Sequence, residues 1–91
     1  MTGCIIMRFW KLKMTHELKV WSEYFHLIRD RKKEFEIRKN DRGFRVGDSL
    51  LLKEWNPKTQ KYTGRYIIRK ITYMIQGKFG LPEDICVMQL R

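Results

Sequence analysis

The chain has 91 residues, which is enough for one small domain with a modest hydrophobic core. Hydrophobic residues make up 43% of the sequence, a fraction that excludes an intrinsically disordered chain. Lysine and arginine number 20 against 10 aspartates and glutamates, so the net charge is +10. This excess predicts a polyanionic partner, nucleic acid ahead of an acidic membrane. The alternative is that the charge only maintains solubility, although acidic residues would serve that purpose as well.

The compartment can be inferred from the cysteines and from the distribution of apolar residues. Cys4 and Cys86 lack the spacing of a metal site or a disulfide framework. Cys86 lies in the run I-C-V-M, where we expect a buried small hydrophobic side chain. No apolar run is long enough to cross a bilayer, and the first positive charges follow the apolar residues, unlike a signal peptide. We therefore predict a cytoplasmic protein without a metal ion or cofactor.

The first 13 residues are predicted to lie outside the main domain, which occupies residues 14–91. They are either an appendage or an added strand, in which Ile5, Met7 and Phe9 would share one face. The strand is favoured, because three large apolar groups would be costly to leave in water.

A strand followed by a helix opens the domain. Glu17–Trp21 alternates as a strand does. Ser22 is a candidate N-cap residue, and the following helix is expected over Glu23–Arg31. Leu27 and Ile28 then fall on one helical face.

Four further segments are predicted as strands. In the first, Lys33–Lys39, Phe35 and Ile37 share one face, while charged residues share the other. The others are Arg45–Trp55, with its three leucines buried; Tyr66–Ile75, with Ile67, Ile71, Tyr73 and Ile75 on one face; and Ile85–Leu90. One helix followed by several short strands predicts an α+β, mainly β fold, a small and partly closed barrel with the helix at one end. Barrel closure would remove exposed strand edges.

Four blocks of sequence, in this order and spacing, resemble the ASCH superfamily. They are H-E-L-K at 16–19, W-S-E-Y-F at 21–25, K-K-E-F-E-I-R-K-N-D-R-G-F-R-V-G-D at 32–48 and Y-T-G-R at 62–65. The resemblance covers residues 14–91 and is nearest to a bacterial and phage branch of unknown function. It implies a PUA-like barrel that binds RNA or modified nucleotides in a cleft beside the helix.

Some ASCH proteins are enzymes, and the resemblance extends to part of their motif. One group hydrolyses acetylated cytidine with a lysine, a threonine and a glutamate. The lysine falls on Lys33 and a following arginine on Arg38, but Glu36 stands at the threonine position. The distant glutamate has no match.

Ten residues form the candidate site. The predicted nucleic-acid-binding residues are Lys33, Glu36, Arg38, Asn40, Arg42, Lys53, Arg65, Arg69, Trp21 and Tyr24. Lys33, Arg38, Asn40 and Arg42 would line the cleft, whereas Lys53, Arg65 and Arg69 would contact phosphates without reading sequence. Trp21 and Tyr24 would stack on a base, unless they are core residues.

Each of these assignments has a structural alternative. Lys33 could simply favour the helix end, where cations are stabilised. Glu36 could orient Arg38, accept an amino group of a base, or only balance nearby cations. Asn40 and Arg42 are also ordinary turn residues.

The leading functional hypothesis is a monomeric, non-catalytic module that binds RNA or a nucleotide. The first alternative is a small hydrolase of acylated nucleosides, or a ribonuclease, with Lys33 and Glu36 as the catalytic residues. The second is a protein-interaction module. We expect no membrane partner.

Overall fold

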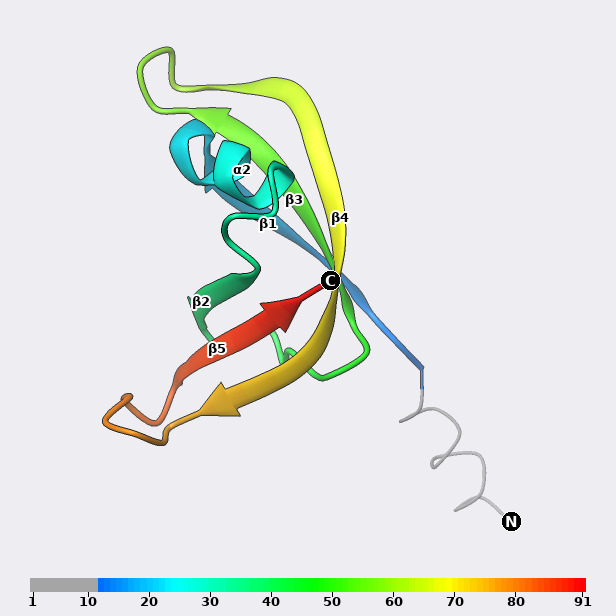
Figure 1. Cartoon of the computed structure of the whole chain (residues 1–91), viewed down its shortest axis with the longest axis vertical. Helices are drawn as coiled ribbons and strands as arrows, with labels where there is room; N and C mark the ends of the chain where they lie inside the picture. Colours follow the sequence, from blue (N-terminus) through cyan, green and yellow to red (C-terminus); the bar gives the residue numbers. More distant parts are fainter. Residues whose placement is uncertain (1–11) are drawn as a thin grey trace.

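The computed structural model describes residues 12–91, and the alternatives for the first 11 residues, an appendage or an added strand, lie outside this range. Figure 1 shows one helix and a curled sheet within the described part. The elements are β1 (Thr15–Trp21), α2 (Ser22–Arg29), β2 (Phe35–Lys39), β3 (Ser49–Asn56), β4 (Lys61–Gln76) and β5 (Ile85–Leu90). The predicted α+β, mainly β, partly closed barrel is confirmed.

The five strands form one sheet in the order β1-β3-β4-β5-β2. β1 runs parallel to β3, and every other pair is antiparallel. β4 is the longest strand and pairs with β3 along its first part and with β5 along its second part (Figure 1). Register shifts interrupt both pairings, and such irregularities increase the local twist and bend of a strand. The sheet therefore curls into a half-barrel whose edges are β1 and β2.

The core lies on the inner side of this curl, where α2 packs against β1 and β3. Alternate residues of the strands point inward, as a pleated sheet requires. The buried apolar residues are Leu18, Val20, Phe25, Ile28, Phe44, Leu50, Leu52, Ile71, Cys86, Met88 and Leu90. The prediction for Cys86 is confirmed, and burial raises the pKa of its thiol.

A buried carboxylate holds the start of β1 against the turn before β3. Asp48 Oδ2 lies 2.9 Å from Nε2 of the buried His16 and accepts a hydrogen bond from the Arg45 amide. Its Oδ1 accepts from the Met14 amide. Burial alone would raise the pKa of Asp48, but the His16 contact and the two amides lower it overall. β3 begins at Ser49, four residues later than predicted, because this turn occupies the preceding residues.

The boundaries of the helix differ from the prediction at both ends. Trp21 is the N-cap residue and Ser22 is already helical, so the predicted Ser22 cap is wrong. The helix ends at Arg29 rather than Arg31, and Arg31 adopts a left-handed conformation with φ 60°. That conformation reverses the chain towards β2 at the position where a helix usually places glycine.

Three apolar side chains point differently from expectation. Leu51 lies on the outer face of β3 and is only half-buried, because Leu50 and Leu52 take the inward positions. The register shift between Ile71 and Tyr73 turns Tyr73 and, by alternation, Ile75 away from the buried face of Ile71, and Met74 packs against the core instead.

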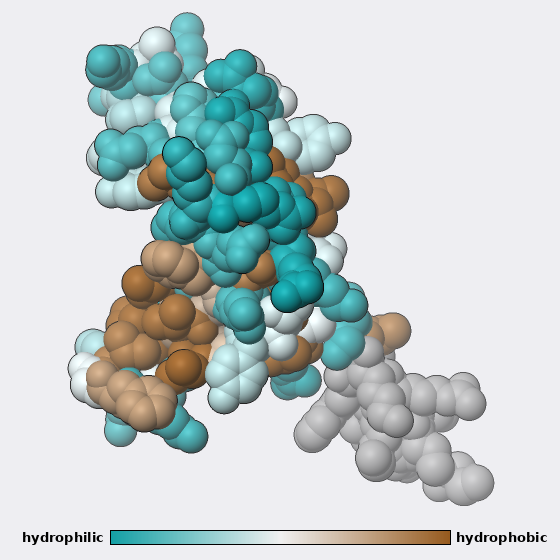
Figure 2. Space-filling model, in the orientation of Figure 1, coloured by the Kyte–Doolittle hydropathy of each residue, from teal (hydrophilic) through white to brown (hydrophobic). Residues whose placement is uncertain are grey.

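The outer face of β2 is apolar and its inner face is charged. Phe35 and Ile37 share one face, as predicted, but that face is exposed. Figure 2 shows hydrophobic side chains gathered over β2, β5 and the loop between β4 and β5. Glu36 points inward and is buried. This orientation positions charged groups of β2 in the opening between the two edge strands.

Candidate binding cleft

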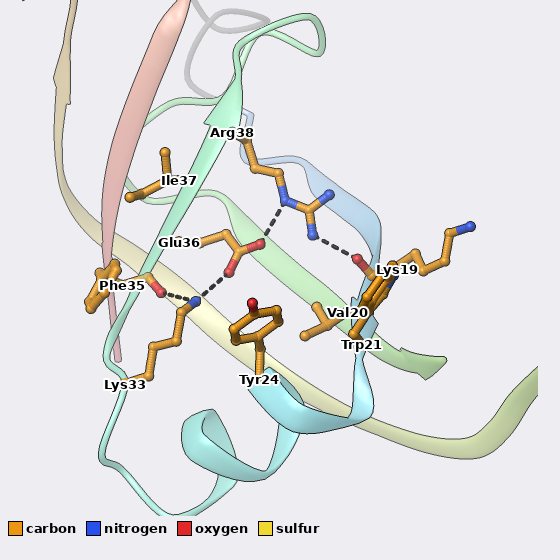
Figure 3. A pocket seen from close by; sticks show the side chains of 9 residues that line it. All are labelled: Lys19, Val20, Trp21, Tyr24, Lys33, Phe35, Glu36, Ile37 and Arg38. Atoms are coloured by element: carbon orange, nitrogen blue, oxygen red, sulfur yellow. Dashed lines mark hydrogen bonds and ion pairs between the residues drawn. The ribbon is translucent and has the colours of Figure 1, made fainter. Parts of the chain in front are cut away.

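A cleft of about 530 Å³ lies at the open seam between β1 and β2, beside α2. Nine residues from these three elements and the segment before β2 line it (Figure 3). Its volume is within the range of small-molecule binding sites. It brings together half of the predicted site: Trp21, Tyr24, Lys33, Glu36 and Arg38.

Glu36 is the centre of the polar network in this cleft. Its side chain is only 7% exposed, and both carboxylate oxygens are occupied. Lys33 Nζ donates to Oε1 at 3.0 Å, and Arg38 Nε donates to Oε2 at 2.6 Å (Figure 3). A buried carboxylate requires such compensation, because an isolated charge is costly to remove from water. The two cations are in turn held in fixed orientations.

Lys33 and Arg38 are also anchored to the backbone. Lys33 Nζ donates to the Phe35 carbonyl at 2.9 Å, and Arg38 Nη2 donates to the Lys19 carbonyl at 2.7 Å. The second bond crosses the seam from β2 to β1. Both side chains stay accessible, 18% for Lys33 and 30% for Arg38. The cleft therefore presents two partly exposed cations whose geometry is already set.

Trp21 and Tyr24 form the aromatic part of the cleft wall, and both side chains are about half exposed. The Tyr24 ring faces Lys33, whose Nζ lies 6.0 Å from the ring centroid. Trp21 lies at the end of β1, on the rim of the cleft (Figure 3). Both rings are accessible to a planar ligand rather than absorbed in the core.

A smaller hollow of about 180 Å³ adjoins the cleft on the far side of Arg38. Arg42 lines it and donates through Nη1 to the Glu17 carbonyl. Arg38 and Arg42 thus both bind carbonyl groups along the edge of β1. Their guanidinium groups therefore occupy backbone acceptors of β1 that a neighbouring strand would pair with in a closed barrel.

Asn40 lines neither hollow. Its side-chain Nδ2 donates to Gln76 Oε1 at 2.7 Å, and its Oδ1 accepts from the Phe44 backbone amide at 2.8 Å. These bonds fix the turn between β2 and β3 to β4, a role typical of asparagine in turns.

The three predicted phosphate-contacting residues lie outside the cleft. Lys53 is on the outer face of β3 and pairs with Glu17 at 3.3 Å. Arg65 pairs with Glu54. Arg69 reaches the Ile28 carbonyl at the end of α2, and burial, with Arg31 nearby, lowers the pKa of its guanidinium.

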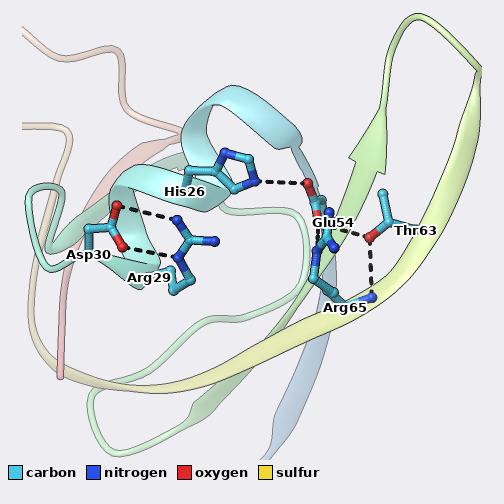
Figure 4. Close-up of polar contacts among 6 residues, drawn as sticks. All are labelled: His26, Arg29, Asp30, Glu54, Thr63 and Arg65. Carbon is cyan, nitrogen blue, oxygen red and sulfur yellow. Dashed lines mark hydrogen bonds and ion pairs between the residues drawn. The ribbon is translucent and has the colours of Figure 1, made fainter.

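A second polar cluster, beneath α2 and centred on Glu54, was not predicted from the sequence (Figure 4). Glu54 is 1% exposed, and its Oε1 accepts from Arg65 Nε at 2.7 Å and from Thr63 Oγ1 at 2.8 Å. His26 Nε2 lies 3.3 Å from Oε2. One signal could have revealed this site: Glu54 continues the inward alternation of Leu50 and Leu52, so the pattern places a carboxylate in the core.

The charge state of Glu54 follows from its partners. Burial alone would raise the pKa of this carboxyl group, but the hydrogen bond of Arg65, the nearby Ser22 hydroxyl and the hydrogen bond of Thr63 lower it to about 2. The Ser22 hydroxyl faces the carboxylate, although its geometry is short of a regular hydrogen bond. Glu54 is therefore ionised at neutral pH and acts as a fixed anion.

Within residues 12–91, no three His, Cys, Asp or Glu side chains are grouped so that they could hold a metal ion. The described helix is also too short and too polar to cross a membrane.

The described residues form a small α+β protein in which a half-closed sheet leaves a charged cleft at its open seam. Residues 15–90 match the family described as a domain of unknown function, DUF3850, and the chain belongs to this family. It is 42% identical over 57 residues to an uncharacterized 12.9 kDa protein in the GpA 3' region of Escherichia phage P2. The match covers 63% of this chain and 50% of the phage protein, so the chain spans about half the length of that relative.

Proposed function

We propose that this protein is a non-catalytic module that binds RNA or a nucleotide in the cleft between β1 and β2, as a monomer in the cytoplasm. One observation carries the proposal: buried Glu36 holds Lys33 and Arg38 in place at the wall of an open cleft. An anion entering the cleft would find donors that need little reorganisation. Preorganised donors bind more tightly than free side chains, because less conformational entropy is lost.

Both cations keep donors for a ligand. The Lys33 ammonium has three hydrogens and uses two, on Glu36 and on the Phe35 carbonyl. The Arg38 guanidinium has five and uses one on Glu36 and one on the Lys19 carbonyl. The remaining donors suit a phosphate oxygen or the acceptor edge of a base.

The aromatic wall and the net charge support the same class of ligand. Trp21 and Tyr24 offer accessible rings on which a base can stack. The net charge of +10 adds a long-range attraction for polyanions. The resemblance to the ASCH superfamily, with its PUA-like barrel and RNA-binding cleft, favours the same conclusion.

Two alternatives each have an observation in their favour. The Lys33–Glu36 contact at 3.0 Å is a possible acid–base pair, which favours a hydrolase of acylated nucleosides or a ribonuclease. However, both oxygens of Glu36 are already occupied. The exposed apolar face around Phe35 and Ile37 favours a protein-interaction module. Cleavage of RNA or of acylated nucleosides would support the first, and a pull-down that survives nuclease treatment would support the second.

The test is a fluorescence-anisotropy titration of a labelled single-stranded RNA at low and moderate salt, with the RNA checked for integrity afterwards. We expect affinity to fall steeply with salt, with a slope that reports the number of phosphate contacts. Arg38→Ala should weaken binding at moderate salt by about 10-fold or more.

Lys78→Ala is the matched control, because it removes one positive charge from an exposed loop residue that does not line the cleft. It should change affinity by less than about 3-fold, as expected for general attraction alone. Equal losses in both variants, or no binding at low salt, would contradict the proposal.

A further inference from the structure

A second surface with chemistry suited to nucleic acid lies on the outer face of β1, β3 and β4 and adjoins the cleft. The strand register places outward residues in rows across the three strands. One row is Trp21, Trp55 and Tyr62, and the next is Lys19, Lys53 and Tyr66. We call these six residues the aromatic–lysine face.

The rings and lysines of this face are in contact. The Trp21 and Trp55 ring centroids are 6.2 Å apart. Lys19 Nζ lies 4.4 Å from the Trp55 ring centroid, and Lys53 Nζ lies 4.9 Å from the Tyr62 ring centroid. Ammonium groups therefore border accessible ring faces, the combination in which a base can stack while its phosphate meets a cation.

The bulge in β4 orients the two tyrosines. Between Lys53 and Trp55 the register shifts, so that Tyr66 pairs with Lys53 and Tyr62 with Trp55. Within the bulge, Thr63 and Arg65 turn inward to bind the buried Glu54 (Figure 4). Tyr62 and Tyr66 remain outward and more than half exposed. The fixed anion beneath α2 thus anchors the segment that presents both rings.

We propose that the aromatic–lysine face is a stacking platform for single-stranded nucleic acid that continues from the cleft. Trp21 and Lys19 belong to both surfaces: each lines the cleft and begins one row of the face. A strand held at Arg38 passes over Trp21 and places its next bases on Trp55 and Tyr62. The inference rests on the proposed function for the class of ligand, but it assigns the length of the ligand and a separate set of contacts.

Charge selects this occupant over a second copy of the chain. Among the outward residues of β1 from Glu17 to Trp21, Glu17 is the acidic one, and its carboxylate is paired with Lys53 at 3.3 Å. A two-fold dimer through this face would bring lysines against lysines. An anionic partner with planar groups satisfies both the rings and the cations.

The experiment compares a labelled ten-nucleotide oligouridine with a labelled trinucleotide, which the cleft alone should accommodate. The double variant Tyr62→Ala/Tyr66→Ala should weaken binding of the ten-nucleotide probe by about 10-fold or more, because each stacked base contributes substantially to affinity. Its salt dependence should be unchanged, since no charge is removed. Trinucleotide affinity should stay at the wild-type value.

Two controls separate stacking from damage to the fold. Tyr73→Ala removes an equally exposed tyrosine from the part of β4 that pairs with β5, and it should leave both affinities unchanged. Tyr62→Phe/Tyr66→Phe should retain binding, because the rings remain. Wild-type affinity of the alanine variant for the long probe, or equal losses with Tyr73→Ala, would overturn the platform.

Failure of the platform is distinguishable from failure of the cleft. If Arg38→Ala affects neither probe while the tyrosine variant loses the long one, the platform stands and the cleft does not bind nucleic acid. If neither probe binds, both proposals fail. A wild-type dimer that becomes monomeric in Tyr62→Ala/Tyr66→Ala, measured by sedimentation, would assign the face to a second copy and overturn the proposal.

Discussion

Two inward-facing glutamates, Glu36 and Glu54, receive similar partners and produce different regions of the molecule. Each accepts a hydrogen bond from an arginine Nε, at 2.6 Å for Glu36 and 2.7 Å for Glu54. Glu36 lies on edge strand β2 at an open cleft, whereas Glu54 lies on the inner strand β3 beneath α2. The same pair of residue types forms a ligand-accessible wall at a sheet edge and an internal anchor within the sheet.

The two glutamates differ in which groups bind them and in whether those groups face the cleft. The partners of Glu36 are two cations that keep free donors facing the cleft. Glu54 is bound by Thr63 and Arg65 from a bulge and approached by His26 from the helix. Loss of Glu36 should therefore act mainly on binding, and loss of Glu54 mainly on stability.

The largest expected effect is that of Glu54→Ala on stability. It leaves the bulge of β4 without its anchor and opens a cavity under α2. We expect a loss of about 3 kcal/mol in the free energy of unfolding, the lower end for breaking a buried ion pair, because Arg65 can be solvated. Urea denaturation followed by circular dichroism measures it. Glu83→Ala, at an exposed loop position, is the control and should change stability by less than about 0.5 kcal/mol.

Lowering the pH should remove the stability that ionised Glu54 contributes. The pKa of Glu54 is about 2 in the folded protein against an ordinary value of 4.5, so the folded state prefers the ionised form. Its contribution is complete above pH 4.5 and is lost as the pH falls towards 2. The difference between wild type and Glu54→Gln should therefore shrink by up to about 3 kcal/mol over this range. A difference that stays constant from pH 5 to pH 2 would show that the charge of Glu54 contributes nothing.

Glu36→Gln, unlike the Glu54 variants, should affect ligand binding more than stability. An amide can accept from one of the two cations but repels the other with its own N–H groups, so Lys33 and Arg38 lose their fixed geometry. We expect a loss of about 1 kcal/mol in stability and a fall of about 5-fold in RNA affinity at moderate salt. Glu54→Gln, assayed where it is fully folded, should bind the trinucleotide as the wild type does. A Glu36→Gln variant with higher affinity would mean that the carboxylate only opposes the ligand.

The sequence predicted these regions unequally, for physical reasons. The helix and the alternating strands follow from periodicity, and the grouping of Lys33, Glu36 and Arg38 follows from proximity in the chain. The inner face of β2 could not be read from alternation, because Phe35 and Ile37 look like the buried side of a strand. Only the open seam, which leaves charged residues a solvated cleft, determines that they face outward.

The partners of Glu54 could not be predicted from the sequence for another reason. The 50-52-54 alternation marks a carboxylate in the core, but nothing local identifies its cation. Arg65 reaches it through a register shift between β3 and β4, and such shifts depend on the whole pairing of the strands. The resemblance to the ASCH superfamily led to the prediction of a barrel with a cleft beside the helix, but it carried no prediction of this contact.

The smallest expected effect concerns Gly64, which lies in the bulge between Thr63 and Arg65. Its φ is +94°, and a Cβ added there would meet no atom within 4 Å. Gly64→Ala should therefore be destabilising through backbone strain alone, by about 1 kcal/mol. Gly43→Ala, at φ +66° and equally open, is the matched control and should cost less, because that conformation is closer to the left-handed region that other residues adopt.

The same substitution also tests whether the bulge that is anchored on Glu54 orients the rings of the aromatic–lysine face. If the bulge presents Tyr62 and Tyr66, Gly64→Ala should also weaken binding of the ten-nucleotide probe, by about 2- to 3-fold, and leave the trinucleotide unaffected. Gly43→Ala lies outside the bulge and should leave the long probe unchanged. A Gly64→Ala protein that is destabilised yet binds the long probe normally would show that the bulge serves the fold and not the orientation of the rings.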